Sequence, residues 1–238
     1  MTCVNLKYMI LSILKYLLNT KRPLIDKVPR LDWRQHFVGF DLPSGDATIY
    51  PQVIMPKKGT LIKLPTKGRG KNTKKGPGEG YLCWQVLRHH LKGFYDNIAV
   101  SVGGHRYVPD LAYIDEEHGI FIDIENDEPY VMSSRIPTHY TGKDDARNRA
   151  FTEAGWIVVR FSERQDFDNA AGSLKFVYDL IRKINPASSI PSCLQNIRSV
   201  ESEPRWSYDH AQQLAAADYR MTYMSKKIEW WLYNRFLS

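Results

Sequence analysis

The feature that most constrains the fold is a strand-like segment, residues 119–125, in which two acids stand among apolar residues. It reads Gly-Ile-Phe-Ile-Asp-Ile-Glu. Side chains two positions apart on a strand point to the same face, so Asp123 and Glu125 project together. Asp110 follows a proline in the preceding apolar run, and an acidic turn at 115–119 joins the two runs as a hairpin. Hairpin pairing can therefore bring Asp110 beside the other two acids.

Three carboxylates on one face of a sheet repel one another, and a divalent cation is the usual resolution. Mg2+ takes oxygen ligands and keeps several waters. Phosphodiester hydrolysis uses such an ion to polarise the phosphate, to lower the pKa of the attacking water and to offset developing charge. We therefore expect Asp110, Asp123 and Glu125 to hold Mg2+ or Mn2+. The alternative is that they are solvated strand ends.

Hydrophobic periodicity from residue 79 onward predicts alternating helices and strands. We expect a helix over 79–92, strands over 98–102, 106–114 and 119–125, a helix over 144–154, a strand over 156–161 and a helix over 169–184. The strand at 156–161 is almost fully apolar and is expected inside the sheet, with Trp156 and Phe161 in the core. This order indicates an α/β sandwich.

Charge divides the chain into a basic N-terminal part and a slightly acidic body. Residues 1–78 carry 15 Lys and Arg against 4 Asp, a net of +11, whereas residues 79–238 carry 18 against 22 Asp and Glu, a net of −4. We assign 1–78 to a basic N-terminal extension, with an expected helix over 1–20, a strand over 48–55 and a flexible Lys/Gly/Pro-rich loop over 56–78. A basic arm beside such a body is typical of nucleic-acid enzymes.

The basic loop is therefore expected to contact DNA phosphates, although it could also be solvated and idle. The cations assigned to this role are Lys67, Arg69, Lys71, Lys74 and Lys75.

Residues 79–185 are expected to form the core and residues 186–238 a helical C-terminal tail. The tail carries many large aromatic residues, too many for an isolated helix. They are Trp206, Tyr208, Tyr219, Tyr223, Trp230, Trp231, Tyr233 and Phe236. We expect them to pack on the core or, alternatively, to form a surface for a protein partner or a homodimer.

The cysteine pattern and the N-terminal apolar run indicate a cytoplasmic protein without a membrane span. The three cysteines are far apart, which favours neither a disulfide framework nor a zinc site. The apolar run near the N-terminus is shorter than the roughly 20 residues that a transmembrane helix needs, so an amphipathic helix is expected instead.

The ordered set of motifs resembles the PD-(D/E)XK nuclease superfamily, and within it the very-short-patch-repair-endonuclease-like branch. The likeness lies in a helix with a leading Glu79, the Pro-Asp pair at 109–110, the acids at 123 and 125, and a later Asp-x-x-Arg helix. That helix is followed by Gly, an aromatic residue, a hydrophobic strand and Arg-Phe, ending at residue 161. The resemblance covers about residues 79–165.

This resemblance implies a restriction-endonuclease-like fold, a mixed β-sheet core flanked by helices, and a Mg2+- or Mn2+-dependent endodeoxyribonuclease that hydrolyses DNA. Asp110 would be the metal-bridging ligand and Asp123 the second ligand. Glu79 matches a helix acid that often binds the metal through water. Glu125 stands where most members have a Lys that orients or deprotonates water.

The departure at position 125 leaves the Lys role to a second metal or to a basic residue from elsewhere. Lys143, His139 and Arg147 are the candidates, because they come just before or inside the next helix. Arg147 is also a DNA-binding candidate, and it could instead pair with a strand acid and hold the helix. The missing Lys also motivates a second reading, a catalytically inactive DNA-binding or scaffolding subunit. A third is an end-processing subunit of a transposition or phage-defence complex.

Four further charged residues receive structural interpretations. Asp127 and Glu128 are expected to be loop acids. Arg160 is expected to face out of its apolar strand in a structural role. Asp144 is expected either to act as a charge at a helix N-terminus, where the helix dipole favours it, or to have a functional role.

Overall fold

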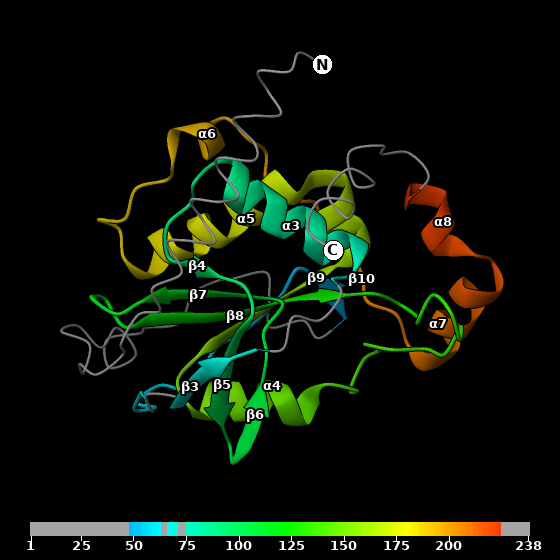
Figure 1. Ribbon diagram of the computed structural model, residues 1–238, viewed down its shortest axis with the longest axis horizontal. Helices are drawn as coiled ribbons and strands as arrows, with labels where there is room; N and C mark the ends of the chain where they lie inside the picture. The colour runs from blue at the N-terminus through cyan, green and yellow to red at the C-terminus, as the bar shows by residue number, and fades with distance from the viewer. Residues whose placement is uncertain (1–47, 63–65, 71–74, 225–238) are drawn as a thin grey trace.

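Figure 1 presents the computed structural model, which describes residues 48–62, 66–70 and 75–224. A mixed five-stranded sheet flanked by helices forms its centre, in agreement with the predicted α/β class. The strand order is β2 (Gln52–Ile54), β9 (Ile157–Ser162), β8 (Ile120–Asp127), β7 (Leu111–Asp115) and β4 (Phe94–Tyr95). Helices α3 (Pro77–Arg88) and α5 (Glu163–Ile184) cover one face and α4 (Asp145–Glu153) the other (Figure 1).

The β7–β8 hairpin and the crossover to β9 follow the sequence prediction. Strands β7 and β8 are antiparallel, with Ala112 opposite Asp123. Strand β9 is parallel to β8 and has β2 on its other side, so it lies inside the sheet as its apolar sequence predicted. Strand β8 continues two residues beyond the predicted end, to Asp127.

The predicted strand over 106–114 is wrong, because two separate strands occupy this run. Strand β6 (His105–Tyr107) pairs with β5 (Ile98–Val102) in a small second sheet, and β7 starts at Leu111. Pro109 lies in the gap, and proline has no backbone N–H with which to continue a ladder. Asp110 consequently precedes β7 instead of lying within a strand.

Parts of the predicted N-terminal extension belong to these sheets. The predicted strand over 48–55 appears as β1 (Ile49–Tyr50) and β2, interrupted at Pro51. Strand β1 pairs with β10 (Glu203–Pro204), and β2 forms an edge of the main sheet. Strand β3 (Thr66–Arg69) lies within the segment predicted as a flexible loop, yet it pairs with β5. The predicted helix over 1–20 lies outside the described residues.

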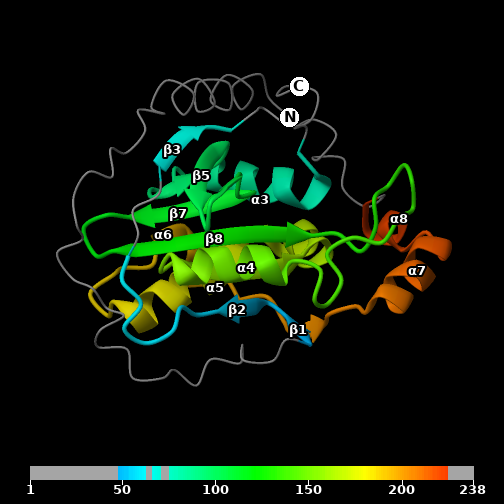
Figure 2. The ribbon, with the colours of Figure 1, turned by 90° about the horizontal axis from the view of Figure 1, so that it is seen from below.

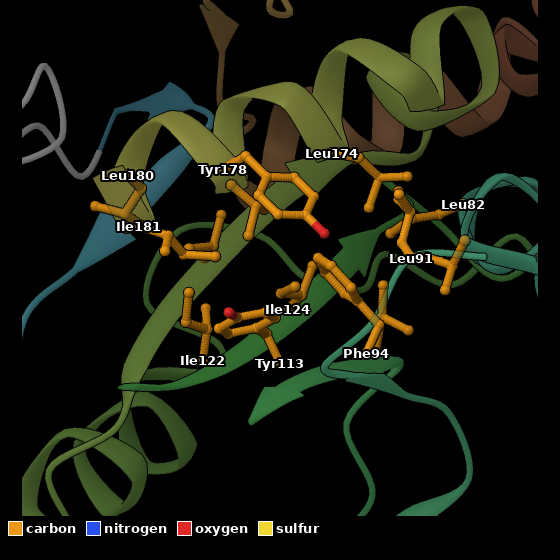
Figure 3. Packing of buried hydrophobic residues seen from close by; sticks show 14 of the residues in the cluster. Leu82, Leu91, Phe94, Tyr113, Ile122, Ile124, Leu174, Tyr178, Leu180 and Ile181 are labelled. Atoms are coloured by element: carbon orange, nitrogen blue, oxygen red, sulfur yellow. The ribbon is translucent and has the colours of Figure 1, made fainter. Parts of the chain in front are cut away.

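Two cores hold the layers together. On the α3–α5 side, Leu174, Tyr178 and Ile181 of α5 pack over Ile122 and Ile124 of β8 (Figure 3). On the α4 side, a second cluster includes Phe121, Phe151 and Trp156. Trp156 and Phe161 are fully buried, as predicted. Because strand residues alternate, Asp123 and Glu125 share the α4 face with Phe121.

Helix α5 begins at Glu163, six residues earlier than predicted. Ser162 caps it, since its hydroxyl accepts the backbone N–H of Gln165 and the Gln165 side chain accepts the N–H of Ser162. Asn169, the predicted start, has non-helical backbone angles and marks a kink inside the helix. The predicted start of the helix therefore coincides with the kink, whereas the helix begins at the Ser162 cap.

The C-terminal tail packs at one end of the sheet. Helices α7 (Tyr208–Ala216) and α8 (Tyr219–Met224) lie beside the loop that follows β8 (Figure 2). Trp206 is buried in a third cluster with Tyr50 and Ala211, and Tyr223 is buried against Phe167 of α5, so packing on the rest of the protein is confirmed for these two, whereas Tyr208 is 45% exposed. The other four aromatic residues of the tail, at 230, 231, 233 and 236, lie outside the described residues. Among those described, no helix combines the length and apolarity needed to span a membrane.

Candidate active site

The structure brings Asp123 and Glu125 to one cation, the guanidinium of Arg147. Arg147 lies in the first turn of α4 and reaches across to β8, where its Nη2 donates to Asp123 Oδ1 at 3.0 Å and to Glu125 Oε1 at 2.6 Å. Its Nη1 also pairs with the second Glu125 oxygen. The guanidinium lies over the rings of Tyr107 and Phe151. We call Arg147, Asp123 and Glu125 the Arg147 cluster.

Asp110 lies next to this cluster, as hairpin pairing predicted. Its backbone N–H donates to Glu125 Oε1 at 3.3 Å. Its carboxylate Oδ2 accepts the backbone N–H of Asn126 at 2.9 Å. The three predicted acids therefore meet at the end of the hairpin away from its turn.

The Arg147 cluster contains more acid than base. Burial raises the pKa of Asp123 to about 6, although the charge of Arg147 opposes this shift. Asp123 is fully buried, and within the described part of the chain its Oδ2 has no hydrogen-bond partner. Arg147 Nε is likewise buried without a partner among these residues. The charge of Asp110 also raises the Asp123 pKa, so the neighbourhood holds three carboxylates and one guanidinium, of which Asp123 and Glu125 contact Arg147.

Glu79 lies at the margin of the site and is already paired. It accepts from Lys75 Nζ at 2.6 Å and from the backbone N–H of Gly76 at 3.2 Å. Burial and the charge of Asp110 raise the pKa of Glu79 to about 7. Lys75, predicted as a phosphate contact in a flexible loop, is instead a largely buried partner of Glu79 and lies 3.6 Å from Asp96.

A second cluster, which the sequence analysis did not assemble, surrounds Arg160 of β9. Its Nε and Nη2 donate to the two Asp127 oxygens at 2.9 and 2.6 Å, and Nη2 also donates to Asp144 Oδ2 at 3.0 Å. Nη1 donates to Asn148 Oδ1 at 2.9 Å. The prediction of an outward-facing Arg160 is wrong, because its side chain is fully buried, and that of a loop Asp127 is wrong, because Asp127 is the last residue of β8.

His139 completes this Arg160 cluster of Arg160, Asp127, Asp144 and His139. Its Nδ1 lies 3.0 Å from Asp144 Oδ2. Burial alone would lower the pKa of His139, but the charge of Asp127 and the hydrogen bond to Asp144 raise it to about 9. Asp127, His139 and Asp144 bring ligand atoms within 4.8 Å of one another, close enough for a metal. Arg160 already pairs with both acids, so these charges are balanced without one.

Among the described residues, the other predicted site residues make no contact with Asp110, Asp123 or Glu125. Lys143 is exposed, and its Nζ lies 5.9 Å from the Tyr140 ring. Lys67 and Arg69 belong to strand β3, of which the structure describes the backbone alone. Lys71 and Lys74 lie outside the described residues. Of the three candidates for the missing Lys role, Arg147 is the one that contacts the acids.

Sequence reasoning also missed residues that hold the site. Asp127 carried a usable signal, because it follows Glu125 by two positions and so shares its strand face. Asp166 of α5 is fully buried and accepts from Asn126 Nδ2 at 2.7 Å, an arrangement that no local pattern indicates.

Comparison of the chain with protein-family models, with curated proteins and with solved structures finds no match.

Proposed function

We propose that the chain is an endonuclease that hydrolyses DNA phosphodiester bonds with bound Mg2+ or Mn2+. The observation that carries this proposal is the convergence of Asp110, Asp123 and Glu125 at one end of the β7–β8 hairpin, with a guanidinium standing between two of them. The succession of helix, antiparallel hairpin, crossover helix and parallel strand also supports a restriction-endonuclease-like core.

The donor types fit a hard divalent cation, although the oxygens of the three acids lie less close together than the ligand atoms of Asp127, His139 and Asp144. All donors are carboxylate oxygens, which Mg2+ prefers. Asp123 offers a buried oxygen without a partner in the described region, and three acids exceed the one arginine. Asp110, Asp123 and Glu125 would hold the ion, with Glu79 binding through water. When bound, the ion would polarise the phosphate and lower the pKa of the attacking water.

Arg147 would change partners in this scheme. With Asp123 and Glu125 engaged as metal ligands, the Arg147 guanidinium, which lies over the rings of Tyr107 and Phe151, would be free to bind another acceptor. A guanidinium presents two parallel N–H donors that match phosphate oxygens, so Arg147 would then bind the DNA phosphate. His139, with a pKa near 9, is protonated at neutral pH and could donate a proton but not take one from water.

One observation favours a second candidate, a catalytically inactive DNA-binding or scaffolding subunit. Arg147 already compensates Asp123 and Glu125 through three contacts, so this pair has a partner without any metal. Metal binding separates the two candidates, because a scaffold has no requirement for a cation at these acids. An end-processing subunit would bind metal but require its assembly partners for cleavage.

The test is nicking of supercoiled plasmid by the full-length protein, with and without Mg2+ or Mn2+. Asp110→Ala should lower the nicking rate at least about 100-fold, because loss of a metal ligand removes transition-state stabilisation. Glu117→Ala is the matched control, since this exposed acid lies in the turn at the far end of the same hairpin. Wild-type nicking by folded Asp110→Ala protein would refute the assignment.

A further inference from the structure

The hydrogen bond that holds Asp110 originates on β8. Asp123 and Glu125 are held by Arg147 from the α4 side, whereas Asp110 Oδ2 accepts the backbone N–H of Asn126 at 2.9 Å. The orientation of the Asp110 carboxylate therefore depends on where the Asn126 peptide lies. Asn126 follows Glu125 directly, so its side chain points to the opposite face of the sheet.

On that opposite face, Asn126 is fixed by α5. Its side-chain Nδ2 donates to Asp166 Oδ2 at 2.7 Å. Asn126 is buried and Asp166 is fully buried, so solvent does not compete for this bond. Asp166 lies in the first turn of α5, and burial raises its pKa to about 8. The pair thus connects the α5 N-terminus to the strand that carries the candidate ligands.

Helix α3 closes over the same amide group. A Cβ built on Gly78 would lie 2.5 Å from Asn126 Nδ2 and 2.8 Å from its Oδ1, distances that real Cβ atoms do not show. Glycine at this position therefore lets α3 approach the Asn126 amide directly. The next residue of α3 is Glu79, whose pKa is raised by burial and, to a smaller extent, by the charge of Asp110. Strand β8 and helices α3 and α5 all meet at Asn126.

An apolar pair would pack at this place without the cost of burying polar groups. The buried bond from Asn126 Nδ2 to Asp166 Oδ2 instead specifies one orientation of the Asn126 amide, since any other leaves this donor unpaired, whereas Asp166 Oδ1 is buried without a partner among the described residues. We propose that Asp166 and Asn126 are positioning residues that hold the Asn126 peptide, and through it the Asp110 carboxylate, in the geometry required for metal binding. The metal-binding part of this inference rests on the proposed function; the positioning part does not.

The test compares Asp166→Ala with Asp166→Asn. The alanine variant removes the acceptor and leaves Asn126 Nδ2 buried and unpaired, whereas the asparagine variant retains a carbonyl oxygen that can accept. Val177→Ala is the matched control, because Val177 is a buried apolar residue of the same helix and its truncation destabilises the core without touching Asn126. All variants are made in the full chain.

The first readout is hydrogen exchange of the Asn126 backbone amide, which reports its bond to Asp110 with no metal present. After correction for global stability, exchange should be about 10-fold faster in Asp166→Ala, as for loss of roughly 1.4 kcal/mol of local protection. Asp166→Asn and Val177→Ala should resemble wild type. Equal corrected exchange in Asp166→Ala and Val177→Ala overturns the proposal.

The second readout is Mn2+ affinity by calorimetry. Asp166→Ala should weaken binding by about 10-fold, the usual cost of losing a group that orients a metal ligand, and Asp166→Asn should remain within about twofold of wild type. If wild-type protein binds no Mn2+ but Asn126 exchange responds to Asp166→Ala, the metal function fails and the positioning stands. If wild type binds Mn2+ and exchange does not respond, the positioning alone fails.

Discussion

The Arg147 cluster and the Arg160 cluster lie on the same side of β8, yet they differ in how completely their acids are neutralised by cations. Arg160 is 0% exposed and each of its terminal nitrogens donates to a protein oxygen, with two acids balanced by Arg160 and a protonated His139. The Arg147 side chain is 17% exposed, its Nε has no partner among the residues that the structure describes, and its acids outnumber it.

This difference separates a structural ion network from a binding site. A buried network whose members are all satisfied gains nothing from a further ligand, whereas removing one member leaves a buried charge uncompensated. A cluster with excess acid and an unpaired buried oxygen gains from a cation. Asp127, His139 and Asp144 therefore contribute to stability. This holds even though their ligand atoms lie within 4.8 Å of one another, a spacing closer to that of a metal site than the spacing in the Arg147 cluster.

The largest expected effect is the loss of stability in Arg160→Met. This change removes the guanidinium that donates to both oxygens of the buried Asp127 and leaves it the more distant His139 charge, which costs about 3–5 kcal/mol. Urea unfolding followed by circular dichroism measures it, and Arg149→Met, an exposed arginine of α4, should stay within about 0.5 kcal/mol of wild type. A loss below about 1 kcal/mol for Arg160→Met would mean that the Arg160 cluster is not a structural network.

Arg147→Met should produce a smaller loss, and a divalent cation should reverse it. Asp123 can take up a proton, and the site is partly exposed, so about 2 kcal/mol is expected. At free Mn2+ near 100 times its dissociation constant, binding returns about 2–3 kcal/mol to the variant, and less to wild type, where Arg147 competes for Asp123 and Glu125. Urea unfolding with and without Mn2+ measures both quantities.

Arg160→Met is the control for that rescue. Its proposed metal site is intact, so Arg160→Met should gain the same stability from Mn2+ as wild type, and the gap between the two should not narrow. Equal rescue of both variants, or of neither, would remove the distinction between the clusters.

The sequence predicted the fold where one local pattern decides the structure. The hairpin, the crossover helix and the inner strand at 157–162 were visible from periodicity and turn residues. The boundary at Asp110 was not, because Pro109 divides one apolar run between two sheets. Likewise, the pairing of Thr66–Arg69 with β5 depends on a partner strand some 30 residues away, which composition does not indicate.

The candidate site was predicted in part for the same reason. Asp110, Asp123 and Glu125 follow from strand alternation and hairpin pairing, which are local. The cations that bind acids come from other elements, so the sequence could propose Arg147 but could not distinguish it from Lys143 or His139. Asp166 contacts Asn126 across 40 residues of chain, and nothing near either residue signals the contact.

The smallest expected effect is the pH dependence that His139 gives to the Arg160 cluster. Its pKa is raised from 6.5 to about 9 in the folded protein. A raised pKa means that the folded state holds the proton more tightly, so the stabilisation is fully present below pH 6.5 and is lost as the pH rises through 9.

His139→Gln retains a hydrogen-bonding side chain without the charge. Because the side chain is 26% exposed, solvent screening reduces the contribution to about 1 kcal/mol. Wild type should therefore exceed His139→Gln in unfolding free energy by about 1 kcal/mol at pH 6, and the two should converge at pH 9.5. Taking the difference between two proteins cancels the titration of groups that they share. A gap that stays constant from pH 6 to 9.5 would show that the His139 charge does not balance Asp127 and Asp144.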